Sequence, residues 1–201
     1  MSGIFWFILA GGTARHDAYA KIRYQLDDDS RLYLKGTSNV NTFICDCQDR
    51  FDTQVIETEH KAGTTKYRYA ELRMRTQTFN CRNRKIDSDM HKALKADRFP
   101  FIKVALLETR QPPRCFEGNC PDWFDVQAKV AITITDATRT ETVPARARIL
   151  GPNRFQIRGD KMLAMTDFGI APPQAMLGLI QVNNAIAIHF DLTIQVDDVN
   201  N

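Results

Sequence analysis

The feature that most constrains this fold is a strict alternation of apolar and polar residues near the C-terminus. Across residues 186–196, every second position holds a large apolar side chain, and alanine or polar residues stand between them. Successive side chains of a β-strand point to opposite faces, so this spacing predicts one long strand with an apolar face and a wet face. The same alternation recurs in other segments, at 22–26, 31–35, 102–106, 126–134 and 155–165. The chain is therefore predicted to be an antiparallel β protein.

About eight strands of this kind must curl until their apolar faces are hidden, and a closed antiparallel barrel does so while enclosing side chains or one ligand. A two-sheet sandwich would bury the same faces, and the alternation by itself favours neither. The chain of 201 residues shows no linker or repeat, so residues 21–201 are predicted to form one domain. Near Tyr69 and Ala70 the apolar phase slips, which predicts a bulge.

One segment has helical spacing. Apolar side chains recur at every fourth position within 86–96, which predicts a helix inserted into the barrel. Asp87 or Ser88 is the expected capping residue at its start. A second, shorter helical turn is predicted within 172–179.

The first twenty residues differ from the rest of the chain. An apolar run at 4–10 is followed by small residues and by Ala-Tyr-Ala at 18–20, which has the form of a signal-peptidase site. We interpret residues 1–20 as an export signal, against the alternative of an N-terminal strand or tail. The protein is then expected to be periplasmic or secreted.

Five cysteines agree with an oxidising compartment. Cys115 and Cys120 bracket a short loop with a Gly-Asn pair, which predicts a local disulfide. Cys45 and Cys47 lie two positions apart, so their side chains share one face of a strand at a spacing that disfavours a bridge between them. Cys81 is a candidate partner for either of them. A zinc site is the alternative, but no histidine lies near these pairs in sequence, and no metal is predicted.

Charge is unevenly distributed along the chain. The net charge is only +3, while residues 61–110 hold 13 Lys or Arg against 5 Asp or Glu. The densest part is Arg82, Arg84 and Lys85, beside the predicted helix. Such a cluster is typical of a solvated face, and the functional alternative is attraction to phosphate head groups or transient contact with an anionic membrane surface. No nucleic-acid partner is predicted, because aromatic residues are not interleaved with these charges.

Sequence motifs give no support for an enzyme. Asp167-Phe168-Gly169 matches the metal-binding tripeptide of protein kinases, but the sequence lacks the glycine-rich loop and the His-Arg-Asp loop that accompany it. The four histidines have no metal-ligand spacing, and the sequence contains no nucleophile elbow. A binding function, which needs no base, nucleophile or metal, is predicted instead.

Four segments resemble motifs of the YceI family, in the family's order: 36–43 (GTSNVNTF), 87–95 (DSDMHKALK), 99–102 (FPFI) and 166–173 (TDFGIAPP). The resemblance covers nearly everything after residue 21. It implies a lipocalin-like antiparallel barrel, commonly exported to the periplasm. It also implies that the barrel binds a long isoprenoid chain, such as a polyprenyl or quinone tail, for transport or storage rather than catalysis. No other cofactor is implied.

The ligand is predicted to enter where irregular segments bound the barrel, because hydrogen bonds fix the wall elsewhere. Phe168, Ile170, Met176 and Leu177 would form an adaptable apolar rim there, or would plug the barrel end. Further predicted ligand contacts come from the helix and the strands: Met90, Leu94, Ile132 and Phe190. The predicted contacts of a polar head group are Arg82, Arg84 and Lys85.

Two functions of other classes stay open on the sequence. An exported thiol-redox or stress-response protein would use Cys45 or Cys47 as its reactive thiol, although the aspartate between them and the predicted strand favour a structural role. An adhesion or scaffold module would have a filled barrel without a cavity.

Overall fold

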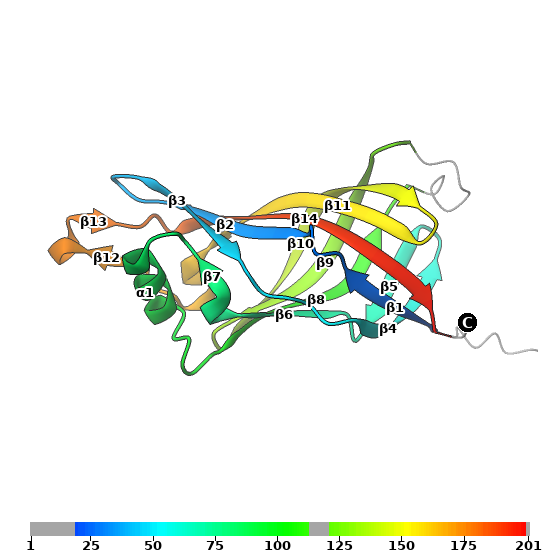
Figure 1. The fold of residues 1–201 in the computed structure, drawn as a ribbon, viewed down its shortest axis with the longest axis horizontal. Coiled ribbons are helices and arrows are strands. Elements are labelled where there is room, and N and C mark those ends of the chain that lie inside the picture. Colours follow the sequence, from blue (N-terminus) through cyan, green and yellow to red (C-terminus); the bar gives the residue numbers. More distant parts are fainter. Residues whose placement is uncertain (1–18, 113–120, 200–201) are drawn as a thin grey trace, which may run out of the picture.

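The apolar alternation corresponds to long antiparallel strands in the computed structural model, which describes residues 19–112 and 121–199 (Figure 1). The strands are β1 (Ala20–Leu26), β2 (Arg31–Thr37), β3 (Thr42–Cys47), β4 (Gln54–Lys61), β5 (Thr64–Arg68), β6 (Glu71–Arg75), β7 (Phe79–Asn80), β8 (Phe101–Arg110), β9 (Phe124–Ile134), β10 (Ala137–Gly151), β11 (Arg154–Ala164), β12 (Gln174–Ala175), β13 (Ile180–Gln181) and β14 (Ala185–Asp198). The helical elements of the described residues are α1 (Arg84–Ala93) and the short 3-10 turns η1 (Thr76–Thr78), η3 (Met165–Phe168) and η4 (Met176–Gly178).

Eight strands form a closed ring, in the order β1-β4-β5-β8-β9-β10-β11-β14 and back to β1. The long strand β14 closes this ring. Its C-terminal half pairs with β1, where Leu26 is opposite Ile194, and its N-terminal half pairs with β2, where Leu34 is opposite Ile188. The strands β2, β3 and β7 therefore extend the wall beyond the point where β1 ends. The predicted antiparallel barrel of about eight strands is confirmed.

The irregularity predicted near Tyr69 and Ala70 is present, but it separates two strands rather than bulging one. Tyr69 adopts a left-handed backbone conformation (φ 63°) and is exposed, while Ala70 is buried. As a result β5 and β6 pair one after the other with the same strand, β8. The phase slip in the sequence marks this break.

Helix α1 begins earlier than its predicted range of 86–96. Its cap is Asn83, whose side chain accepts hydrogen bonds from the backbone N–H groups of Lys85 and Ile86. The prediction of Asp87 or Ser88 as the cap was wrong. The helix starts with polar residues, Arg84 and Lys85, and the spacing of apolar residues gives no information about where that polar part begins. The short helical turn predicted within 172–179 corresponds to η4, which lies at the tip of the two-stranded hairpin of β12 and β13.

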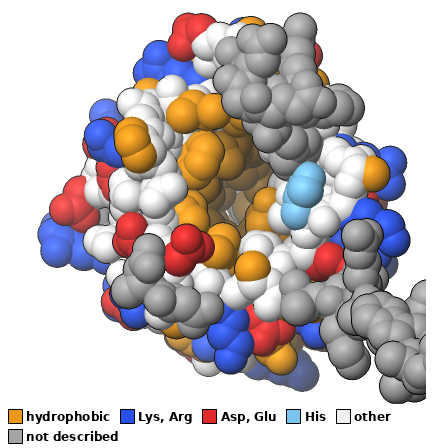
Figure 2. Space-filling view, turned by 90° about the vertical axis from the view of Figure 1, so that its right-hand side faces the viewer, with side chains coloured by type: hydrophobic (Ala, Val, Ile, Leu, Met, Phe, Trp, Pro, Cys, Tyr) orange, Lys and Arg blue, Asp and Glu red, His pale blue; other side chains and the backbone are white. Residues whose placement is uncertain are grey.

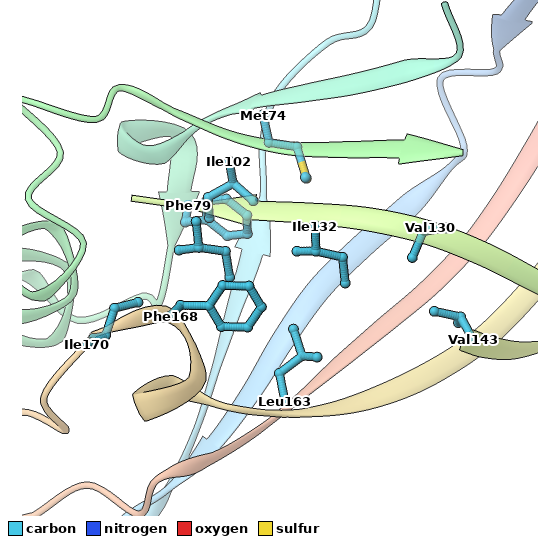
Figure 3. Close-up of a cluster of buried hydrophobic side chains, with 10 residues drawn as sticks. Met74, Phe79, Ile102, Val130, Ile132, Val143, Leu163, Phe168 and Ile170 are labelled. Atoms are coloured by element: carbon cyan, nitrogen blue, oxygen red, sulfur yellow. The ribbon is translucent and has the colours of Figure 1, made fainter. Parts of the chain in front are cut away.

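The largest buried cluster lies in the half of the barrel next to α1 (Figure 3). Its buried members come from strands on several sides of the wall, from η3 and from the segment after it: Met74, Phe79, Ile102, Val130, Ile132, Ile134, Val143, Leu163, Phe168 and Ile170. Among the described residues, no helix has the length and apolar character needed to cross a membrane.

Candidate ligand cavity

An apolar cavity of about 450 Å³ occupies the α1 half of the barrel. Inward-facing residues of the wall strands form one part of its lining, and cross-strand partners among them share the inner face. Val104 is opposite Ile132 on β9, and Leu163 is opposite Ile186 on β14. The rest of the lining comes from α1 and its flanking residues, from the β2–β3 loop and from the segment from η3 to Val182. A volume of this size lies within the range of about 300–1,000 Å³ found for ligand sites.

Two glycines leave room for aromatic rings on the inner face. A Cβ on Gly36 would lie 2.2 Å from the Phe43 ring, and a Cβ on Gly159 would lie 2.7 Å from the Phe190 ring. Because glycine has no Cβ, each ring can pack closely against the backbone of the neighbouring strand. Phe43 lines the cavity. Phe190 packs against the buried cluster and does not line the cavity.

Of the four residues of the predicted rim, two are buried and two are exposed. Phe168 is 1% exposed and Ile170 is 5% exposed, and Figure 3 shows the Phe168 ring lying between Ile132 and Leu163. Gly169 makes the turn between them with φ at 66°, and the Phe168 carbonyl accepts a hydrogen bond from the Thr135 hydroxyl at 3.1 Å. These two residues line the cavity as part of its packed wall, so they do not form an exposed rim.

Met176 and Leu177 are the exposed part of the predicted rim. Met176 lines the cavity and is 65% exposed, whereas Leu177 is fully exposed and lies outside the lining. Met90, Leu94 and Ile132 all line the cavity. Six of the eight predicted contacts are thus brought together in one cavity, and contact of these residues with a ligand stays a prediction.

The three predicted head-group residues lie in different places. Lys85 lines the cavity beside Asp89, with its Nζ 3.2 Å from the carboxylate. Arg82 points to Asp46, at 3.2 Å, and Arg84 lies at a separate groove on the outer side of α1. Of the three, Lys85 alone reaches the cavity, because consecutive residues on a turn and helix point in different directions.

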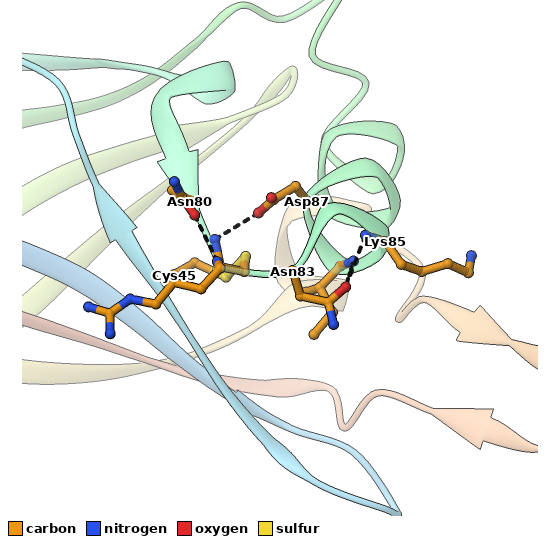
Figure 4. The surroundings of a disulfide bond; sticks show 8 residues. Cys45, Asn80, Asn83, Lys85 and Asp87 are labelled. Carbon is orange, nitrogen blue, oxygen red and sulfur yellow. Dashed lines mark hydrogen bonds between the residues drawn. A yellow bond between two sulfur atoms is a disulfide. The ribbon is translucent and has the colours of Figure 1, made fainter.

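Helix α1, which covers part of the cavity, is attached firmly at its N-terminal end (Figure 4). A disulfide joins Cys45 of β3 to Cys81, just before the helix. The Asp87 carboxylate accepts a hydrogen bond from the Cys81 backbone at 2.7 Å, and Asn80 accepts one from Arg82 at 2.7 Å. Of the two candidate partners of Cys81, Cys45 and Cys47, the structure therefore pairs Cys45.

Cys47 keeps a free thiol that packs against the core. Burial raises the pKa of this thiol, whereas reactive cysteines have a lowered pKa and an exposed, electropositive setting. Cys115, Cys120 and residues 1–18 lie outside the described residues. Within residues 19–112 and 121–199, no group of three or more His, Cys, Asp or Glu side chains is placed to hold a metal ion.

A charged pair interrupts the apolar inner face of the wall. The β10–β11 ladder ends at Ala145 and Gly159, and beyond that pair Lys161 of β11 reaches Glu141 of β10 at 2.6 Å. Lys161 is opposite Ile188 on β14, so it stands in the inward phase of its strand. The ion pair therefore spans the place where these two strands separate.

Several cavity residues were missed among the predicted contacts, although the sequence contained a signal for most of them. They stand in the apolar phase of predicted strands or in the first segment that resembles the YceI family: Leu32, Leu34, Phe43, Ile102, Val104, Ile186 and Ile188. Their alternation was visible, but which part of each strand lines a cavity depends on register with distant strands.

The opposite end of the barrel is also hollowed. Figure 2 looks into that end and shows a recess lined largely by hydrophobic side chains. Two tyrosines stand on the inner face there: Tyr24 is opposite Val196, and Tyr67 is opposite Thr58. Burial raises the pKa of Tyr24 to about 12, and the Tyr67 hydroxyl lies 2.9 Å from the Thr109 hydroxyl. The inner face of this half therefore carries tyrosine hydroxyl groups as well as apolar side chains.

Comparisons with known proteins agree with this architecture. Residues 24–194 match the family model described as a YceI-like domain. A solved polyisoprenoid binding domain from Saccharophagus degradans, implicated in plant cell wall breakdown, has 11% identity and a TM-score of 0.61, over 87% of this chain and 98% of that one. BcnA from Burkholderia cenocepacia has 13% identity and a TM-score of 0.59, over 84% of this chain and 99% of that one. No curated protein sequence matches the chain significantly.

Proposed function

Because this chain belongs to the YceI-like domain family, we propose that it binds a long isoprenoid chain in the apolar cavity. The cavity itself carries the proposal: strands from around the barrel leave about 450 Å³ unfilled and line it with aliphatic and aromatic side chains. An isoprenoid tail gains roughly 0.8 kcal/mol for each methylene-sized unit that it buries. The similar domain from Saccharophagus degradans is described as polyisoprenoid binding, which supports the same ligand class here.

The polar end of such a ligand is assigned to the part of the cavity next to α1. Lys85, Asp89 and Asn83 contribute polar groups to the lining there, and Asn41 does so from the loop after β2. A phosphate or a quinone ring could accept a hydrogen bond from the Lys85 ammonium group. Arg82 and Arg84, which lie away from the cavity, are not part of this assignment.

The proposal is one of carriage or storage outside the cytoplasm, without catalysis. The Cys45–Cys81 disulfide supports an oxidising compartment. The thiol-redox alternative is disfavoured by the raised pKa of Cys47 and by its packing against the core. The scaffold alternative required a filled barrel, and the cavity argues against it.

The test is direct ligand recovery combined with a cavity-filling variant. Protein purified from its native host is extracted with organic solvent, and the extract is analysed by mass spectrometry for prenyl lipids. In parallel, Ala93→Phe places a ring in the cavity, because Ala93 lines it from α1. Val55→Phe, on the exposed outer face of β4, is the matched control.

We expect prenyl lipid in the extract and about tenfold weaker binding of a fluorescent prenyl probe by Ala93→Phe, with Val55→Phe unchanged. An extract without lipid, together with equal probe binding by both variants, would refute the proposal. Turnover of a thiol or peroxide substrate by the lipid-free protein would favour the redox alternative.

A further inference from the structure

Two loops at the α1 end expose large apolar side chains. Val40 is 61% exposed in the β2–β3 loop, and Met176, Leu177 and Leu179 are 65%, 106% and 72% exposed around the β12–β13 hairpin. We call these four residues the tip surface. Figure 1 shows the hairpin and the β2–β3 loop projecting from the same end of the molecule. Exposed apolar side chains gathered in one place are typical of an interaction site.

The two loops are held together as one unit. The Asn39 side chain donates a hydrogen bond to the Leu179 carbonyl at 2.8 Å and accepts one from the Gln181 backbone at 3.0 Å. Ser38 and Val182 form an antiparallel bridge, so backbone contacts reinforce the side-chain ones. The tip surface is therefore a defined arrangement that spans two loops distant in sequence.

The two sequence segments that contain the tip surface have no charged residues. Residues 36–45 and residues 168–188 contain no Asp, Glu, Lys or Arg, although a quarter of the whole chain is charged. At the other end of the barrel, Lys61, Asp197 and Asp198 stand exposed at the strand ends. Met176 and Leu177 also keep large side chains in left-handed backbone conformations, where glycine is favoured. Solubility alone would favour polar residues or glycine at both positions.

Helix α1, which lies at the same end of the molecule as these two loops, is rich in basic residues (Figure 1). Residues 82–98, which include α1, hold six Lys or Arg and three Asp. Val40 and Met176 of the tip surface line the same cavity as Lys85, so the exposed apolar side chains are continuous with the cavity. An apolar surface beside basic residues complements a bilayer that contains anionic lipids.

We propose that the tip surface inserts into an anionic bilayer and brings the cavity mouth to the membrane, so that a lipid chain passes between them without crossing water. The proposal rests on the isoprenoid-binding function and deepens it. A bilayer fits better than a protein partner, because stable protein interfaces bury about 800 Å² on each side with matching shape, which two narrow loops do not offer. Insertion into acyl chains needs no such match.

The test measures binding of the whole protein to sedimented vesicles. One set contains phosphatidylcholine and phosphatidylglycerol in equal amounts, and the other contains phosphatidylcholine alone. The variant Leu177→Ser/Leu179→Ser removes apolar area from the hairpin, and Val40→Ser does so independently from the other loop. Ile149→Ser/Leu150→Ser is the matched control, since both residues are exposed on β10, away from the tip surface. Circular dichroism checks that each variant is folded.

We expect the wild-type protein to bind the anionic vesicles and to bind phosphatidylcholine more weakly. The double variant of the hairpin should bind anionic vesicles about tenfold more weakly, or worse, while the control is unchanged. If the wild-type protein bound neither kind of vesicle, the proposal would be overturned. A protein partner would then be the alternative occupant of the tip surface. Equal losses in the hairpin variant and the control would overturn it as well.

A separate measurement distinguishes this proposal from the underlying function. A short fluorescent prenyl probe is added to the protein without vesicles, and its transfer out of labelled vesicles is then timed. The hairpin variant should bind the free probe as the wild type does but remove it from vesicles more slowly. Probe binding without vesicle binding would refute the docking proposal alone, whereas vesicle binding without probe binding would refute the isoprenoid-binding function alone.

Discussion

The two ends of the barrel close by different means. At the β1 end, backbone ladders of β1 with β14 and with β4 complete the ring. At the α1 end, the backbone ladder between β3 and β7 is only two residue pairs long, and side chains add to it: Asp49, after β3, binds Arg75 of β6 at 2.7 Å, and the disulfide joins Cys45 to Cys81. A ladder spreads stability over many backbone hydrogen bonds, whereas side-chain closure concentrates it in a few groups. Single substitutions should therefore matter more at the α1 end.

The interiors of the two ends differ as well. The α1 half is lined with aliphatic side chains and phenylalanines around its cavity, while the β1 half places Tyr24, Tyr67 and Thr109 on the inner face. The same period-two pattern thus produces an apolar chamber at the α1 end and, at the β1 end, an inner face that also carries hydroxyl groups. The ligand tail is expected in the first, where burial requires no hydrogen-bond partner.

The largest effect is expected from Phe168→Ala. The ring is 1% exposed in the α1 half, and removing it should lower the free energy of unfolding by about 3–5 kcal/mol in urea denaturation. Phe155→Ala is the comparison at the other end, because Phe155 is only partly buried, opposite Ile194. If both variants lost the same free energy of unfolding, single substitutions would not matter more at the α1 end than at the β1 end.

The double variant Cys45→Ser/Cys81→Ser should have the next largest effect. The bond closes a loop with a sequence separation of 36 residues, and its loss should cost about 3 kcal/mol of stability. Hydrogen exchange should increase mainly in α1 and β3, with the β1–β14 ladder still protected. Cys47→Ser is the control, and faster exchange spread evenly over both ends would contradict side-chain closure.

Asp49→Asn tests the ion pair in this closure. The Asp49 side chain is 4% exposed and accepts hydrogen bonds from the backbone and the guanidinium of Arg75. Burial by itself raises the pKa of Asp49, but the hydrogen bonds and charge of Arg75 outweigh it and hold the pKa below its usual value. The free energy of unfolding of the variant, measured by urea denaturation near neutral pH, should be about 1–2 kcal/mol lower than that of the wild type.

The pH dependence of that loss checks its cause. A carboxylate with a lowered native pKa stabilises the fold above its unfolded pKa of about 3.9, and the contribution disappears as the pH falls through the native value. The difference between the wild type and Asp49→Asn should therefore shrink below about pH 4. A difference that stays constant into acid would show that shape, not charge, matters at this position.

The smallest effect is expected at the β1 end, from Tyr67→Phe. The substitution removes the hydrogen bond to Thr109 and should cost about 1 kcal/mol or less, because the ladders of β5 remain intact. Affinity for the fluorescent prenyl probe, measured by titration, should not change. A clear loss of affinity would mean that the ligand extends into the β1 half of the barrel.

Patterns local in the sequence predicted the strand content and the position of the helix. The alternation at 186–196 became the inner and outer faces of β14, and the phase slip at 69–70 became the break between β5 and β6. The four segments that resemble the YceI family anticipated the fold. These predictions succeeded because a strand's two faces and a helix's spacing follow from backbone geometry within a few residues.

Relations between distant residues needed the tertiary structure. The spacing of Cys45 and Cys47 left either as the partner of Cys81, and Asn83 caps the helix in place of Asp87, which instead holds the Cys81 backbone. Equally apolar residues have different fates: Phe168 is packed inside, while Leu177, nine positions on, is fully exposed. Register and closure of the barrel decide such outcomes, because they set which strands meet, and periodicity within one strand carries no information about its neighbours.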